Sequence, residues 1–195
     1  MFEMTAKADV VKIDYERVPA IWQERTRFIA IRAQINKTYS DPNLIQQIAV
    51  HEAAHAIYLE KAGTIGIRFF GPKILFDITK ADPFDFENAS VQGSGHDGKQ
   101  TFDIAWVLRG TKACLAGGIA VRELTRVSDG GESGDIKRIE AFFEKVSASG
   151  LLPEFNADET TKKAYAELRK EIKELPLQAE IWTKVGEVIP IICRQ

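Results

Sequence analysis

The fold prediction for this chain starts from residues 47–63, QIAVHEAAHAIYLEKAG. The segment follows residues 40–42, Ser-Asp-Pro, in which a capping side chain precedes a proline at the first helical position, and it ends in a glycine, a typical stop. These signals predict a helix over about 42–62. His51 and His55 are four residues apart, so their imidazoles lie one above the other on the same face of that helix.

The two histidines lie in the middle of an apolar stripe that also contains Leu44, Ile48 and Leu59. An unpaired polar group in such a stripe costs about 1–3 kcal/mol. A divalent cation removes this cost, because two neutral imidazoles are zinc ligands. Glu52 points about 100° further round the helix, where it can hold and deprotonate a metal-bound water. This is the physical content of the HExxH pattern, and the alternative is a chance match with two core histidines that are satisfied in other ways.

A catalytic zinc needs a third protein ligand and an open fourth position. The metzincin extension HExxHxxGxxH is excluded, because a tyrosine and a lysine stand where its glycine and third histidine belong. Glu123 and Glu140 are candidates by residue type, as in thermolysin-type sites. Asp135 has the better position, because it follows a glycine-rich turn and begins an inward apolar stripe on its helix. The alternatives are that Asp135 only caps that helix or that Glu123 takes the third position.

The rest of the chain is predicted to be mainly helical with a small β-sheet. Two short strands, broken by a Gly-Pro pair, are expected within 65–78, where β-branched and aromatic residues are frequent. Residues 82–100 are rich in glycine and polar residues and are predicted to form a long surface loop. Five further helices are predicted, at about 16–38, 101–126, 135–146, 157–174 and 177–189.

The composition suits one soluble globular domain. The 195 residues are 45% hydrophobic, enough for a single core. We expect an N-terminal segment and helix (1–40), a zinc-binding catalytic core (41–150) and C-terminal helices (151–195). A net charge of -2 without blocks of like charge disfavours nucleic acid or an anionic membrane as a partner. No stretch reaches the roughly 18 apolar residues of a membrane span, so the expected location is the cytoplasm. Cys114 and Cys193 are too few and too isolated for a disulfide framework.

Three segments together resemble the peptidase domain of FtsH-type ATP-dependent zinc proteases: HEAAHAIYL, LAGGIAVREL and GGESGDIKRIEAF. The resemblance covers about 43–143 and implies a zincin-like fold, a helical bundle that carries the HExxH helix. It makes His51, His55 and Asp135 the ligands of one zinc ion per chain and Glu52 the general base. Glu123 matches a glutamate that would support the ligands from outside the coordination shell.

Four positions depart from the motifs of the family: Ala54, Ile119, Arg122 and Gly134. The sequence also lacks the GxxxxGK[ST] loop of an ATPase module. We therefore predict a zinc metalloendopeptidase that hydrolyses unfolded or exposed polypeptide segments without ATP. One strand of 65–78 would provide an edge for the peptide substrate, as the resemblance implies.

Two alternatives stay open: a regulatory metallopeptidase with one specific partner, and an inactive metal-stabilised interaction module. His96, in the segment 82–100, is a candidate for stabilising an oxyanion, although an exposed loop histidine is the simpler interpretation. Homo-oligomers occur in the family, and the sequence leaves the oligomeric state open.

Overall fold

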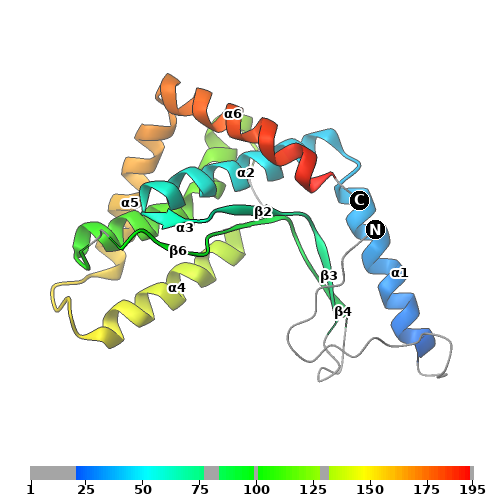
Figure 1. Cartoon of the computed structure of the whole chain (residues 1–195), viewed down its shortest axis with the longest axis horizontal. Helices are drawn as coiled ribbons and strands as arrows, with labels where there is room; N and C mark the ends of the chain where they lie inside the picture. The colour runs from blue at the N-terminus through cyan, green and yellow to red at the C-terminus, as the bar shows by residue number, and fades with distance from the viewer. Residues whose placement is uncertain (1–20, 77–83, 99–100, 128–131, 194–195) are drawn as a thin grey trace.

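The structure is a computed structural model that describes residues 21–76, 84–98, 101–127 and 132–193 (Figure 1). As predicted, the described chain is mainly helical with a small antiparallel β part. Its helices are α1 (Ile21–Thr38), α2 (Pro42–Lys61), α3 (Ile104–Thr125), α4 (Glu132–Ser149), α5 (Ala157–Ile172) and α6 (Leu175–Ile192). Apart from the first, whose predicted start near residue 16 lies outside the described residues, each begins and ends within a few residues of the predicted bounds.

Helix α2 begins and ends where its sequence signals place it. Asp41 caps its N-terminus, where Oδ1 accepts the Asn43 amide at 2.8 Å, and Pro42 is its first residue. Gly63 follows the helix with a φ of 77°, a left-handed conformation that suits glycine. Residues 49–58 are all buried, so α2 is surrounded by other elements over its middle turns.

Two helices and the β ribbon surround α2. Both α3 and α6 pack on it, and α3 also packs on α4 and α5. The backbones of α2 and α3 can approach each other closely because α3 has several small buried residues, among them Ala113, Ala116, Gly117 and Ala120. By length and composition alone α3 could cross a membrane, and half of its most apolar stretch is buried inside the described structure. Its packing on three helices accounts for this apolar composition, and the predicted lack of a membrane span stays a prediction.

A polar network connects α5 to α2 and α3. The buried Tyr58 hydroxyl donates to Glu171 Oε2 at 2.6 Å. Lys112 Nζ donates to Glu171 Oε1 at 2.7 Å and pairs with Glu167 at 2.5 Å. Because one glutamate accepts from two different helices, the network fixes α2 relative to α3.

The β part follows a single register from end to end. On one side are β1 (Thr64–Ile65), β2 (Arg68–Phe70) and β3 (Lys73–Phe76), and they pair with β6 (Gly95–His96), β5 (Ser90–Gln92) and β4 (Phe84–Glu87). The register does not shift at either interruption, so the three two-stranded sheets form one antiparallel ribbon. In Figure 1 the ribbon runs beside α2 and then turns away from the helix bundle toward α1, which contacts β4.

The prediction of a surface loop over 82–100 is wrong for the described residues 84–98, because they supply the returning strands β4 to β6. The ends of the predicted loop, 82–83 and 99–100, lie outside the described residues. Apolar and polar residues alternate in FDFE at 84–87 and again in ASVQ at 89–92, which is typical of strands. Asn88 interrupts the alternation. Gly93 is a packing requirement and not a loop signal, since a Cβ there would lie 2.0 Å from Thr64 Cγ2. The segment 65–78, for which two strands were predicted, contains part of β1 and all of β2 and β3.

Candidate metal centre

The structure brings together three side chains that could hold a metal ion, His51, His55 and Asp135. The histidines come from the middle of α2, and Asp135 comes from the first turn of α4. All three are buried, with exposed fractions of 9%, 3% and 5%. Residues 80 positions apart in the sequence therefore meet at one point inside the molecule.

The three candidate ligand atoms form a small triangle. The two histidine Nε2 atoms are 2.9 Å apart. Asp135 Oδ2 lies 3.3 Å from His51 Nε2 and 3.2 Å from His55 Nε2. A tetrahedral zinc ion with ligands at 2.0–2.1 Å separates its ligand atoms by about 3.3 Å. The triangle is thus close to one face of such a tetrahedron.

The hydrogen bond of His55 Nδ1 determines which nitrogen of this imidazole carries the proton. His55 Nδ1 is 2.6 Å from the carbonyl oxygen of Ala113, so Nδ1 carries the proton and donates. Neutral His55 then presents a bare Nε2 toward Asp135, whose carboxylate also only accepts. Two acceptors facing each other need a cation between them, either a metal ion or an extra proton on the imidazole. A backbone carbonyl is one of the usual hydrogen-bond partners of the second ring nitrogen of a metal-ligating histidine.

Gly117 of α3 packs against the two imidazoles. A Cβ at this position would lie 2.5 Å from His55 Nε2 and 2.7 Å from two ring carbons of His51. Carbon atoms in contact are normally about 3.5–4.0 Å apart, so no larger residue fits. The absence of a side chain at Gly117 is what leaves room for the two imidazoles.

Asp135 and Glu52 differ in their electrostatic surroundings. Burial alone would raise the pKa of Asp135, but hydrogen bonds with His51 and His55 outweigh burial and hold this pKa below its usual range. The pKa of Glu52 is raised, mainly by burial, against a smaller opposing effect of the two histidines. Asp135 is therefore an anionic candidate ligand, whereas Glu52 is a more basic carboxylate that is suited to accept a proton.

We expect the Glu52→Gln variant to be more stable than the native chain when both are metal-free at neutral pH, by on the order of 1 kcal/mol. Because its folded pKa is raised, Glu52 contributes stability that is present below the unfolded value of 4.5 and is lost as the pH rises through the folded value. Glutamine carries no charge to bury. Urea unfolding with a chelator should show the gain at neutral pH and a smaller gain below pH 4.5, and equal stability at neutral pH would contradict the prediction.

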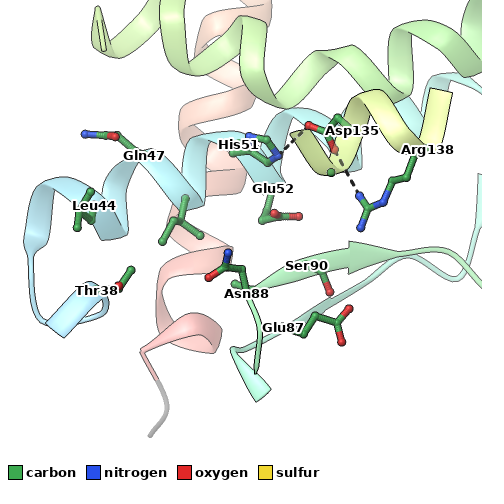
Figure 2. Close-up of a pocket in the computed structure, with 13 residues that line it drawn as sticks. Thr38, Leu44, Gln47, His51, Glu52, Glu87, Asn88, Ser90, Asp135 and Arg138 are labelled. Atoms are coloured by element: carbon green, nitrogen blue, oxygen red, sulfur yellow. Dashed lines mark hydrogen bonds and ion pairs between the residues drawn. The ribbon is translucent and has the colours of Figure 1, made fainter. Parts of the chain in front are cut away.

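A cleft of about 370 Å³ opens onto the triangle (Figure 2). Its floor is α2, with Ile48, His51 and Glu52, and the first turns of α4 form one side. Residues 87–90, from the end of β4 to the start of β5, form the opposite wall, so the strands that line the cleft belong to the returning half of the ribbon and not to the described residues 65–76. Glu52 faces this cleft and is not part of the ligand triangle.

Tyr39 holds the wall of the cleft in place. Its hydroxyl accepts the Ala89 amide at 2.9 Å, and both residues are buried. Ala89 lies at the interruption between β4 and β5, where a ribbon partner for its amide is replaced by this hydroxyl. Burial raises the pKa of Tyr39 to about 12, so the hydroxyl stays protonated.

We expect Tyr39→Phe to lower the free energy of unfolding by about 1–3 kcal/mol, because the buried Ala89 amide loses its acceptor. The wall at 87–90 should also become less ordered, which would show as faster amide hydrogen exchange of Ala89 and Ser90. Tyr165→Phe is the matched control, since Tyr165 is partly exposed on α5, outside the cleft. Unchanged exchange at Ala89 would contradict the role of Tyr39.

The other residues considered from the sequence lie away from the triangle. Glu123 Oε1 accepts from Arg169 Nε at 2.6 Å, and Oε2 lies 3.4 Å from Lys173 Nζ, so this carboxylate ties α3 to α5. The structure does not bring Glu123 to the histidines. Glu140 is exposed on α4, and His96 is exposed in β6. Both are described residues, and neither lines the cleft.

Two residues that the structure places at the cleft or its wall, Tyr39 and Arg138, were not among the candidates from the sequence. Arg138 follows Asp135 by one helical turn, and its Nη1 lies 3.5 Å from Asp135 Oδ1. This spacing was available from the sequence once Asp135 was a candidate. No local signal points to Tyr39, because its contact with Ala89 spans 50 residues.

No protein-family model matches the chain, and no curated protein matches it. The indication that a metal ion binds here therefore comes from the donor atoms of His51, His55 and Asp135 and from their geometry.

Proposed function

We propose that this protein is a zinc-dependent endopeptidase that hydrolyses peptide bonds in unfolded or exposed polypeptide segments without ATP. One arrangement supports this proposal: a buried group of two histidines and an aspartate lies at the base of a cleft that also contains Glu52. The motifs that resemble FtsH-type peptidases, and the zincin-like fold they imply, agree with this assignment.

The residues present fit a zinc ion. Two imidazole nitrogens and one carboxylate oxygen are a typical donor set for a catalytic zinc, which keeps its fourth position open. His51, His55 and Asp135 would hold the ion, and Gly117 leaves the space that the rings need. When bound, zinc would supply a Lewis acid that polarises the scissile carbonyl and makes water more acidic.

Glu52 would act as the proton carrier of the reaction. The attacking water adds to the carbonyl carbon and gives one proton to Glu52, the C–N bond breaks, and Glu52 returns that proton to the leaving amine. Burial raises the pKa of this carboxylate, which makes it a stronger base than an exposed glutamate. One residue thus serves as base and then as acid.

The depth of the site supports the proposed substrate class. Glu52 and His55 are 7% and 3% exposed, so a peptide bond must enter the cleft to reach them. A folded surface cannot do this, whereas an extended segment, a chain terminus or a flexible loop can. The open cleft also distinguishes this site from structural metal sites, in which four protein ligands normally complete the coordination of the metal.

The test is hydrolysis of an unfolded, casein-like protein by the purified chain. We expect cleavage that a chelator abolishes and added zinc restores, with a compactly folded protein left uncut. Cleavage of only one partner protein would favour the regulatory peptidase. Zinc binding without any turnover would favour the interaction module and contradict the proposal.

A further inference from the structure

Arg138 is the only lysine or arginine among the described residues that line the cleft. The carboxylates of the lining are Glu52, Glu87 and Asp135, and the remaining polar residues are neutral side chains and His51. A single cation in a cleft with three acids is a feature that the ligand triangle and Glu52 do not explain.

The position of Arg138 relates it directly to the candidate metal. Asp135 turns Oδ2 to the two histidines and Oδ1 to Arg138 Nη1, which is 3.5 Å away. Arg138 is therefore separated from the metal position by a single carboxylate group. In Figure 2 its guanidinium group lies between Asp135 and the strand that bears Ser90.

The guanidinium group has donors to spare. The contact with Asp135 is long, near the limit of a hydrogen bond, and the Arg138 side chain is 57% exposed. A guanidinium carries five N–H donors in a planar fork. The contact with Asp135 uses one nitrogen, Nη1, and the side chain lines the cleft, so a substrate oxygen that binds there can accept from the remaining donors.

The proposed reaction creates a negative charge that needs such a donor. When water adds to the scissile carbonyl, charge develops on the carbonyl oxygen, and fixed donors lower the barrier most effectively at this point. His96, the sequence candidate for this task, lies outside the cleft lining. Arg138 is inside it and carries a permanent positive charge.

We propose that Arg138 is a catalytic residue that donates hydrogen bonds to the carbonyl oxygen of the scissile peptide bond as negative charge develops on it. This inference rests on the proposed peptidase function. Two other roles compete with it: Arg138 could only orient Asp135, or it could only bind a carboxylate of the substrate. The three roles differ in what they change.

Phenylphosphonate, a tetrahedral anion that resembles the charged state, tests the proposal without turnover. It is titrated into the zinc-loaded protein by calorimetry, with zinc affinity measured separately. Arg138→Gln should weaken phosphonate binding at least about tenfold while zinc affinity stays within about threefold. Arg138→Lys should lose less. Lys137→Gln makes the same change of net charge at an exposed neighbour on α4 and should change neither value.

Hydrolysis gives the second readout. Arg138→Gln should lower kcat about 100-fold and leave KM within about threefold. Loss of zinc affinity with unchanged phosphonate binding to the loaded protein would assign Arg138 to Asp135 alone and overturn the proposal. A rise in KM with kcat unchanged would also overturn it. If the loaded native chain cleaves no peptide, the peptidase function fails, and equal phosphonate binding by the native chain and Arg138→Gln would still separately refute the role of Arg138.

Discussion

Glu52→Gln should reduce peptide-bond hydrolysis by about 100- to 10,000-fold and leave the zinc content at that of the native chain. Glutamine has nearly the shape of glutamate but cannot accept the proton of the attacking water. Glu52 is outside the ligand triangle, so its replacement removes no metal donor. Parallel measurements of kcat and of bound zinc per chain separate loss of the base from loss of the metal.

The matched control for Glu52 is Glu140→Gln. Glu140 is exposed on α4 and lies outside the cleft, so this variant makes the same chemical change without touching the site. It should keep the activity and the zinc content of the native chain. Full proteolysis by a zinc-containing Glu52→Gln variant would remove Glu52 from the mechanism.

Gly117→Ala should damage the metal site, because its added methyl group collides with both imidazoles. The new Cβ would lie 2.5 Å from His55 Nε2 and 2.7 Å from His51 ring carbons, and both rings are enclosed by packed helices. Overpacking of this kind lowers the free energy of unfolding by about 1–3 kcal/mol. Because the displaced atoms include a candidate ligand, we also expect zinc affinity to fall on the order of 100-fold.

Gly186→Ala distinguishes this steric effect from helix propensity. Gly186 is also a helix glycine, in α6, and nothing lies within 4 Å of the position of its Cβ. Alanine should therefore stabilise the protein there, by about 0.5–1 kcal/mol. Zinc titration and urea unfolding of both variants give the comparison. If Gly117→Ala bound zinc as tightly as Gly186→Ala, the packing of α3 against the rings would be irrelevant to the site.

The helices could be predicted from the sequence because their signals are local. A proline after a capping aspartate starts α2, and a glycine in a left-handed conformation follows its end. The spacing of His51 and His55 on one helical face is also local information. Asp135 could be placed near them only through the motif resemblance and the stripe on its own helix, because no local rule determines a contact across 80 residues.

The pairing of the ribbon strands and the surroundings of Glu123 could not be predicted from local signals. Glycines near the end of the returning strand suggest a loop, but Gly93 is required because the Thr64 side chain occupies the space beside it. Glu123 stands at a matching position of a helix motif, yet Arg169 of α5 and Lys173, which follows the last residue of α5, pair with it. In both cases the deciding partner is distant in the sequence, and its position depends on the packed structure.

Zinc titration of the metal-free chain, with bound zinc determined by elemental analysis after gel filtration, shows whether His51, His55 and Asp135 hold a metal ion. We expect one zinc ion per chain, a thermal midpoint that rises with zinc, and an affinity lower by on the order of 100-fold or more in Asp135→Ala, which lacks one of the three proposed ligands. A native chain that binds no zinc, or an Asp135→Ala variant that binds it equally well, would show that these three side chains do not form a zinc site.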